Sequence, residues 1–323
     1  MLAAATLLLI ARTSYPLGGA CEPLPPNPSI VVVGGTAGGV IAAIAAARYG
    51  TSQVLLLELG THLGGMVSSG LGWTDGKPSG GIAAEFFAKA GSIHVTPAAA
   101  ERIFDEMVQN ETLITVVRNC GVVAASRRGG RIESIVVDGG ATVTAKMFID
   151  ATYEGDLMRH TPGVESTFGR EAKTKYNETY AGRRDPYGYM DWAPVSPYKL
   201  VNGEAKLLYP LVTDEYATPL GEGDNKVQNY NFRLCVTKKV NTSIDIDMHN
   251  HVEAIPFPKP SNYNRSDWEL LLKYANVNTK NGTVPDQLSH YLNSFGTLPN
   301  NKFDMNNGGL ISTDCTGCQW SYP

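Results

Sequence analysis

The chain has 323 residues, a formal net charge of −4 and a pI near 5.9, and 43% of its residues are hydrophobic. This composition excludes a disordered or fibrous protein, and the length allows one large domain or two ordinary ones. The slightly acidic balance gives no electrostatic reason to expect nucleic acid or an anionic membrane as a partner.

The N-terminus has the features of a secretory signal peptide. Residues 2–11 (LAAATLLLIA) form an apolar run that is too short to span a bilayer but suits the core of a signal. Small residues at 18–20 suit cleavage before Cys21, although no Lys or Arg precedes the run. We predict a signal peptide over residues 1–20 and a secreted or secretory-pathway protein with no membrane contact after cleavage. A ragged cytosolic N-terminus is the alternative, and a lipoprotein anchored at Cys21 matches less well.

Five N-x-[ST] sequons without a central proline support a secretory route, because this motif is the acceptor for N-linked glycans. Sequons also arise by chance, so they serve only as supporting observations. For a eukaryotic host we predict a glycoprotein, with acceptors among Asn110, Asn177, Asn241, Asn264 and Asn281.

Cysteine and histidine usage predicts no metal site. The cysteines are an odd number spread over a long chain, unlike those of a disulfide-dense small domain. Cys315 and Cys318 form one CxxC, which suits a redox pair, half of a metal site, a local disulfide or two ordinary thiols. The only close histidine pair is His249 and His251, and no second CxxC accompanies the first.

A strand, a glycine-rich turn, a helix and a second strand follow a Pro-rich spacer at residues 21–28. Ile30–Val33 is a continuous β-branched run, as expected of a strand buried on both faces. Gly38–Tyr49 is rich in small apolar residues and Gly50 suits a C-cap, so we predict a helix that packs closely on a sheet. With the strand Gln53–Leu57, this segment makes a βαβ unit of the usual size.

The following segments predict a change of architecture. Residues 60–81 are too rich in glycine for a regular element, and these glycines permit close backbone approach or positive φ. A helix is predicted at Ala98–Val108, after Thr96-Pro97. From Gly163 to about Asn300 the composition shifts to Tyr, Asn, Pro and Lys, with one short helix predicted at Leu270–Tyr274. Before that shift, runs separated by hairpin turns predict an antiparallel meander of three strands: Gly121–Ser126, Arg131–Val137 and Thr142–Ile149.

The turn GGTAGG (Gly34–Gly39) is similar to a dinucleotide-binding loop that carries threonine in place of its middle glycine. In such a loop the first glycine makes the turn, the second admits the pyrophosphate and the third lets helix and strand pack closely. Gly34 and Gly39 take the first and third positions, Thr36 takes the second, and Gly35 and Gly38 add flexibility. The phosphates would lie on the helix N-terminus, with the Thr36 hydroxyl as a candidate donor to a phosphate oxygen.

Glu58 closes the second strand, where a carboxylate accepts hydrogen bonds from ribose hydroxyls. This carboxylate would repel a 2′-phosphate, so FAD or NAD fits better than NADP. The loop alone does not separate FAD from NAD. The alternative is a doubly wound domain that binds no nucleotide.

The residues after the second strand carry a resemblance to a known family. LELGTHLGGMVSSGLGWTD (Leu57–Asp75) resembles the corresponding segment of the FAD-dependent oxidoreductase family in the glutathione-reductase-like superfamily, some members of which carry the label "xanthan lyase". Members of that family similarly have threonine inside the glycine loop. The resemblance continues, in order, through FIDATYEGDLM (Phe148–Met158), FGREA (Phe168–Ala172), YNFRLC (Tyr230–Cys235), IPFPKPSNY (Ile255–Tyr263) and GGLISTD (Gly308–Asp314).

The resemblance implies FAD as the cofactor and an α/β fold. That fold is a Rossmann-like FAD-binding domain with an antiparallel β-meander, plus an inserted mixed α+β substrate domain. The adenine would rest near Gly121–Val123, the turn Asp150–Thr152 would close a second edge of the site, and Gly64 and Gly65 would lie against the flavin end. The implied cofactor-binding residues are Gly34, Gly35, Thr36, Ala37, Gly38, Gly39, Glu58, Gly64, Gly65, Met66, Val122, Asp150 and Ala151.

The resemblance also divides the chain. It implies an FAD-binding domain over residues 29–160, a substrate or cap domain over 161–300 and an incomplete return segment over 301–323. Two departures accompany it: the stretch between Phe87 and His94 is shorter than in relatives, and the sequence stops at Pro323, where relatives continue. We therefore expect a C-terminally truncated chain: a fragment, a mispredicted gene product or a degenerate copy.

The leading hypothesis is an FAD-dependent oxidoreductase that transfers a hydride between a small organic substrate and flavin. The alternatives are an inactive remnant that folds partly or binds nucleotide without turnover, and, less well supported, an NAD-dependent dehydrogenase. Neither the catalytic residues nor the oligomeric state is assigned. For each candidate for a substrate-side role, an ion pair or a structural hydrogen bond is the favoured alternative: His62, Tyr153, Glu154, Arg170 and Arg233. Asp156 is expected to support the turn near FAD.

Overall fold

The computed structural model describes residues 21, 23–50, 52–76, 80–184, 196, 198–210, 218–227, 230–231, 233–238, 244–246, 264, 266, 269, 293–307 and 314–315. Its helices are α2 (Ala37–Tyr49), η1 (Gly65–Val67), α3 (Gly81–Ala90), α4 (Pro97–Gln109), η2 (Asp138–Gly140), α5 (Asp156–Arg159) and α6 (Lys173–Tyr176). The first strands are β1 (Ile30–Val33), β2 (Val54–Leu57), β3 (Ile114–Val117), β4 (Val122–Arg128), β5 (Arg131–Val137), β6 (Thr142–Thr144) and β7 (Met147–Asp150). The later ones are β8 (Tyr198–Val201), β9 (Glu204–Leu208), β10 (Tyr230–Asn231), β11 (Leu234–Lys238), β12 (Ile244–Ile246), β13 (Asn293–Leu298), β14 (Lys302–Asn307) and β15 (Asp314–Cys315).

A four-stranded parallel sheet forms the centre of the N-terminal part, in the order β3-β2-β1-β7. Strand β1 lies between β2 and β7, so its apolar run is covered on both faces and hydrogen-bonded on both edges. The predicted strands at Ile30–Val33 and Gln53–Leu57 and the helix between them are confirmed as β1, β2 and α2. The predicted α/β class is therefore correct.

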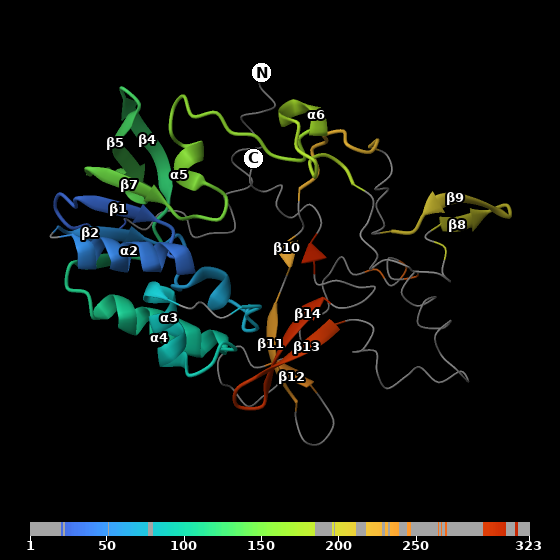
Figure 1. Cartoon of the computed structure of the whole chain (residues 1–323), viewed down its shortest axis with the longest axis horizontal. Helices are drawn as coiled ribbons and strands as arrows, with labels where there is room; N and C mark the ends of the chain where they lie inside the picture. Colours follow the sequence, from blue (N-terminus) through green and yellow to red (C-terminus); the bar gives the residue numbers. More distant parts are fainter. Residues whose placement is uncertain are drawn as a thin grey trace.

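The two faces of this sheet carry two separate cores, as Figure 1 shows, with α2, α3 and α4 below the sheet and the meander above it. Side chains of a strand alternate between faces, so Val32 and Leu56 pack with the helices. Their neighbours Val31 and Leu57 pack with the meander and α5 instead. The sheet is thus buried between two layers, which gives a rigid frame for the turns at its strand ends.

The meander β4-β5-β6 is antiparallel, as predicted, but the third predicted strand is wrong in its extent. The run Thr142–Ile149 divides into β6 and β7, and β7 leaves the meander to pair with β1. The division falls where the Lys146 and Met147 N–H groups both donate to the Ser29 carbonyl, at 3.0 and 3.1 Å. The strand-like composition of this run does not show that its two parts join different sheets.

Among the elements around the parallel sheet, a helix and an edge strand were not predicted from the sequence. Helix α3 occupies Gly81–Ala90, and strand β3 pairs with β2 at the edge of the sheet. The predicted helix at Ala98–Val108 is confirmed as α4, which begins after Thr96. The predicted helix at Leu270–Tyr274 lies outside the described residues, as do His249, His251 and Cys318.

A second, antiparallel sheet has the order β12-β11-β14-β13 and lies against the glycine-rich stretch. A Cβ atom on Gly70 would come 2.3 Å from the Arg233 carbonyl oxygen, and one on Gly72 would come 2.9 Å from Leu298. A Cβ atom on Gly296 would come 2.4 Å from the Trp73 ring, which stacks on His94. These glycines therefore serve the contact between the two sheets.

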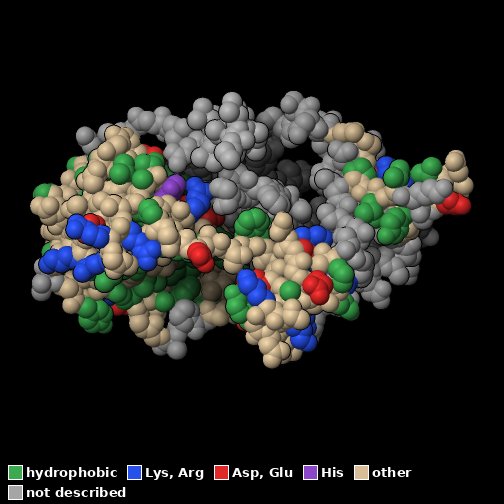
Figure 2. Space-filling model, turned by 90° about the horizontal axis from the view of Figure 1, so that it is seen from above, with side chains coloured by type: hydrophobic (Ala, Val, Ile, Leu, Met, Phe, Trp, Pro, Cys, Tyr) green, Lys and Arg blue, Asp and Glu red, His purple; other side chains and the backbone are tan. Residues whose placement is uncertain are grey.

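The β8–β9 hairpin carries apolar side chains on its surface, as Figure 2 shows, and Leu200 and Leu207 are exposed there.

A disulfide joins Cys21 to Cys120, which sequence reasoning left unpaired. Both cysteines are buried in the core between the sheet and the meander. The Cys120 N–H donates to the Glu58 carbonyl at 2.9 Å, so the bridge fixes the N-terminal segment beside the end of β2.

In the described ranges, no helix is long and apolar enough to cross a membrane. The same ranges hold no cluster of three or more His, Cys, Asp or Glu residues suited to a metal.

Candidate functional site

Three turns meet at the carboxyl ends of β1, β2 and β7. The Gly34 N–H donates to the Leu57 carbonyl at 2.8 Å, and the Ala151 N–H donates to the Val33 carbonyl at 2.8 Å. The Gly64 N–H donates to the Gly35 carbonyl at 2.7 Å, which joins the glycine-rich stretch to the first turn. In open α/β sheets this edge is where ligands bind.

Gly34 and Gly39 are structural glycines, as the first and third positions of the motif predict. Gly34 has a φ of 98°, and a Cβ atom there would lie 2.8 Å from the Ala151 carbonyl group. A Cβ atom on Gly39 would lie 1.9 Å from the Gly34 carbonyl oxygen. Only glycine fits either position, because the obstacle is backbone in both cases.

Thr36 is the N-cap of α2, and its hydroxyl is directed into the protein. The Gly39 N–H donates to Thr36 Oγ1 at 3.1 Å, and Thr36 Oγ1 donates to the Ala151 carbonyl at 2.8 Å. A hydroxyl has one proton, and this one is already committed to Ala151. The expectation that Thr36 donates to a phosphate oxygen is therefore wrong. Its side chain instead joins α2 to the turn after β7.

The open part of the α2 N-terminus lies at Ala37 and Gly38. Their N–H groups belong to the first turn, so no carbonyl within the helix can accept from them. Gly38 is exposed, and the nearest atom to a Cβ built on it is Thr36 Oγ1 at 3.8 Å. Free N–H groups, the helix dipole and open space together favour an anionic group here.

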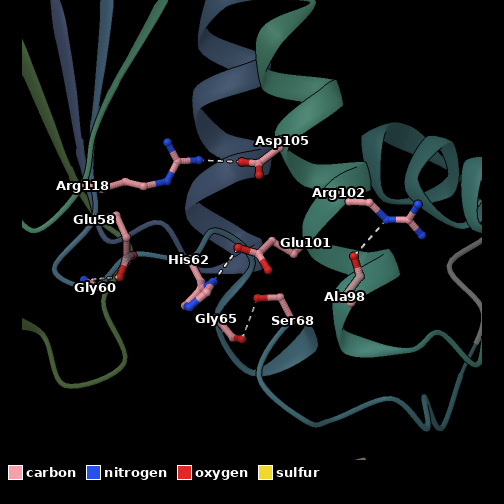
Figure 3. A network of polar contacts seen from close by, with 10 residues as sticks. All are labelled: Glu58, Gly60, His62, Gly65, Ser68, Ala98, Glu101, Arg102, Asp105 and Arg118. Atoms are coloured by element: carbon pink, nitrogen blue, oxygen red, sulfur yellow. Dashed lines mark hydrogen bonds and ion pairs between the residues drawn. The ribbon is translucent and has the colours of Figure 1, made fainter. Parts of the chain in front are cut away.

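The Glu58 carboxylate is held beside this turn by two backbone groups. The Gly35 N–H donates to Oε2 at 2.7 Å, and the Gly60 N–H donates to Oε1 at 2.6 Å; Figure 3 shows the second contact. Each oxygen of a carboxylate has two acceptor sites, so each keeps one for a further donor. A half-buried, fixed carboxylate of this kind suits the hydroxyls of a ribose.

The Gly64–Met66 turn lies against the α2 N-terminus. Gly64 has a φ of 103° and packs on Phe104, while a Cβ atom on Gly65 would lie 2.2 Å from the Tyr153 hydroxyl oxygen. The Met66 N–H donates to that same oxygen at 2.7 Å. Tyr153 thus spans from the turn after β7 to the glycine-rich stretch, a contact that no sequence pattern signalled. Burial raises the pKa of Tyr153, and the nearby charges of Glu58 and Glu154 add to the rise.

The other two segments implied by the family resemblance lie at the same edge in different ways. Gly121 is adjacent to the Glu58 turn, since a Cβ atom on it would lie 3.0 Å from Leu59 Cδ1, and the Val122 side chain is buried in the core. The Asp150 carboxylate accepts from the N–H groups of Thr152 and Met158, so its side chain caps α5. The Asp150 side chain therefore serves the turn after β7 and the start of α5.

The arginine and histidine candidates for a substrate-side role each contact a carboxylate of the protein, which is the arrangement that the structural alternative describes. His62 Nδ1 lies 2.5 Å from Glu101 Oε1 (Figure 3). Arg170 makes a two-pronged contact with Asp224 and lowers the pKa of that carboxyl well below its usual range. Arg233 pairs with the buried Asp304 in the second sheet.

Asp156 lies at the start of α5. Its backbone N–H donates to Thr152 Oγ1, and burial raises the pKa of the Asp156 carboxyl.

The sequence of residues 29–322 matches the family model described as FAD dependent oxidoreductase. The chain belongs to this family. No curated protein shows significant sequence similarity to this member of the family.

Structural likenesses of this FAD dependent oxidoreductase cover less than half of its length. Thioredoxin reductase of T. acidophilum is 18% identical, with a TM-score of 0.30 and coverage of 39% of this chain and 35% of that one. L-proline dehydrogenase of P. horikoshii is 13% identical, with a TM-score of 0.35 and coverage of 46% and 59%. A flavin monooxygenase of Stenotrophomonas maltophilia is 20% identical, with a TM-score of 0.28 and coverage of 38% and 37%. Likenesses at this level add nothing to the family assignment.

FAD is the cofactor of this family, and the residues at the strand ends fit it. The Ala37 and Gly38 N–H groups have no acceptor within the helix, Gly38 has open space beside it for a diphosphate, and Glu58 keeps acceptor sites for a ribose. Gly64 and Gly65 bring backbone close to the same helix end. These positions are fixed by contacts within the protein itself.

Proposed function

We propose that this protein transfers a hydride between a small organic substrate and a flavin held at the carboxyl ends of β1, β2 and β7. The observation that carries the proposal is the exposed, sterically open Gly38 at the N-terminus of a 13-residue helix, beside a fixed carboxylate. Bound FAD supplies the redox chemistry, while the chain supplies binding, orientation and exclusion of water.

The residues have separate roles in this proposal. The Ala37 and Gly38 N–H groups bind the diphosphate, and Glu58 accepts from the ribose hydroxyls. The backbone at Gly121 and Val122 lies beside Glu58 and supports the adenine. The turn at residues 64–66 borders the flavin half, because it lies on the side of the α2 N-terminus that leads to the second sheet.

The substrate is proposed to bind between that turn and a substrate domain within residues 161–300. Gly70 contacts Arg233, the residue before β11, and Gly72 and Trp73 contact β13. These contacts support the placement, because they bring the second sheet against the glycine-rich stretch. The exclusion of water from a flavin requires such a cover.

Gly38 offers a sharp test. We expect Gly38→Asp to leave the ligand-free fold as stable as wild type or up to about 1 kcal/mol more stable, because an acidic residue in the first turn favours the helix dipole. Its carboxylate would stand in the open space and repel a diphosphate. Two like charges in contact near a protein surface repel by roughly 4 kcal/mol, so we expect FAD affinity to fall by about 100-fold or more. Titration calorimetry of flavin-free protein measures the affinity.

Gly38→Asn is the matched control, because it adds the same bulk without the charge. We expect it to bind FAD more weakly than wild type but clearly better than Gly38→Asp. Thermal melting of both ligand-free variants shows whether the fold is kept. Unchanged FAD affinity in a folded Gly38→Asp variant would refute the assignment of this helix end to the diphosphate.

We further propose that the protein is exported, with residues 1–20 removed. The buried Cys21–Cys120 disulfide supports this, because such bonds form and persist in oxidising compartments. In a eukaryotic secretory host, we expect the protein in the medium to begin at Cys21, to carry removable N-glycans and to have both cysteines blocked until reduction. A charge in the apolar run, as in Leu8→Asp, should abolish export. Retention of an uncleaved wild-type chain inside the cell would contradict the proposal.

A further inference from the structure

We propose that Tyr153 is a further cofactor-binding residue, whose hydroxyl donates its proton to the diphosphate of the bound dinucleotide. This inference rests on the proposed function, because it assigns a donor to the same site. It gives a role to a side chain that the glycine-loop motif does not include.

The first argument is the hydrogen-bonding state of the phenol. The oxygen of Tyr153 accepts the Met66 N–H at 2.7 Å, which uses an acceptor site and leaves the proton of the hydroxyl to be donated. Among the described residues, the Met66 contact is the one hydrogen bond that the Tyr153 hydroxyl makes, and in it the oxygen is the acceptor. The ring is half exposed, with 51% of the residue accessible, so the donor is available to a ligand.

The second argument is the place of the hydroxyl. A single point, the position of a Cβ atom on Gly65, lies 2.2 Å from the Tyr153 oxygen and 3.1 Å from Thr36 Cα. The hydroxyl therefore lies close to the N-cap of α2, where the helix begins. The ligand group that favours this position is anionic, because the helix dipole and the unpaired N–H groups point there.

The third argument is the protonation state. Burial and the charges of Glu58 and Glu154 raise the pKa of Tyr153 above its usual value, so the phenol is neutral at physiological pH. Its proton is therefore present to be donated. A hydrogen bond from a neutral donor to a charged acceptor is stronger than one between neutral groups.

The fourth argument is the requirement for glycine at position 65. Gly65 has a φ of 54°, and any side chain there would collide with the Tyr153 oxygen. The absence of a side chain lets the phenol reach Met66 and lie over the turn. Glycine at 65 and tyrosine at 153 thus form one arrangement that places a hydroxyl on the Met66 N–H, close to the N-cap of α2.

The test compares three ligands on flavin-free wild-type and Tyr153→Phe protein by titration calorimetry. Adenosine lacks phosphates, ADP carries the diphosphate without the flavin, and FAD carries both. We expect Tyr153→Phe to weaken ADP and FAD by a similar factor, about tenfold to 100-fold, with adenosine affinity unchanged. The ratio of ADP affinity to adenosine affinity isolates the contribution of the diphosphate. A general loosening of the site would weaken adenosine as well as ADP, and so would be recognised by the loss of adenosine affinity.

Tyr176→Phe is the matched control, since Tyr176 is an exposed tyrosine on α6. Thermal melting of the ligand-free variants shows that each is folded, and Phe retains the ring that covers Gly65. Equal ADP affinity in wild type and Tyr153→Phe would overturn the inference, and so would a loss confined to FAD, which would place the hydroxyl against the flavin. If wild-type protein binds neither ADP nor FAD, the proposed function itself fails, so the two failures are distinguishable.

Discussion

At the scale of single residues, Thr36 shows how a glycine loop works without its middle glycine. Its side chain turns inward, caps α2 and bonds to the carbonyl of Ala151, so it leaves the outer surface of the turn open. The space for a ligand is at Gly38 instead, two positions along. The sequence suggested that threonine is tolerated here. The direction of its hydroxyl could not be predicted, because the acceptor is 115 residues away.

The contribution of the two hydrogen bonds of the Thr36 hydroxyl can be measured through the free energy of unfolding. Thr36→Val keeps the shape of the side chain but leaves the Gly39 N–H and the Ala151 carbonyl without their partner. We expect it to lower the free energy of unfolding by about 1–3 kcal/mol, from the lost cap and the unpaired groups. Thr36→Ser keeps the hydroxyl and should lose less than about 1 kcal/mol. Urea denaturation provides the comparison, and equal midpoints for the valine and serine variants would count against the proposed role.

At the scale of elements, local patterns were sufficient where the fold is local. The unit β1–α2–β2 was predicted closely, because a β-branched run, a glycine turn and a small-residue helix are all neighbours in sequence. The division of Thr142–Ile149 into β6 and β7 was missed, because it depends on pairing with β1, over 100 residues earlier. Strand β3 has only four residues and lies at the edge of the sheet, so its pattern is short and only partly buried.

The glycine-rich stretch shows the same limit in the candidate site. Its glycines were expected to allow close backbone approach, and they do, but to two different neighbours. Gly64 and Gly65 approach the α2 N-terminus, whereas Gly70 and Gly72 approach the second sheet. A glycine-rich composition predicts that another segment approaches this backbone closely, and only the tertiary structure shows which segment approaches each glycine.

The junction at Gly70 gives a prediction at this scale. Gly70 has a φ of 140°, and a Cβ atom there would lie 2.3 Å from the carbonyl oxygen of Arg233, the residue before β11. We expect Gly70→Ala, which strains the backbone at this positive φ and crowds Arg233, to increase hydrogen exchange in β11 and β13 and to leave β1 and β2 unchanged. Gly76→Ala is the matched control, since nothing lies within 4 Å of its Cβ position. Unchanged exchange in β11 and β13 would show that the junction does not hold the second sheet in place.

At the scale of the whole molecule, the candidate site draws on residues from the first half of the chain only. Its turns come from residues 34–39, 58–66, 121–122 and 150–153, and the parallel sheet holds them together. The second sheet contributes at the junction, where it meets the glycine-rich stretch. In the proposed function, the cofactor and the substrate therefore bind to different parts of the chain.

The Cys21–Cys120 disulfide has one more consequence, which concerns cleavage of the chain. It closes a covalent ring of backbone that contains Gly34–Gly39, Glu58 and the Gly64–Met66 turn. A protease that cuts this ring once produces two fragments that stay joined through the sulfur atoms. The cut chain separates on a gel only after reduction, and until then no segment of the ring can diffuse away from the sheet that positions it.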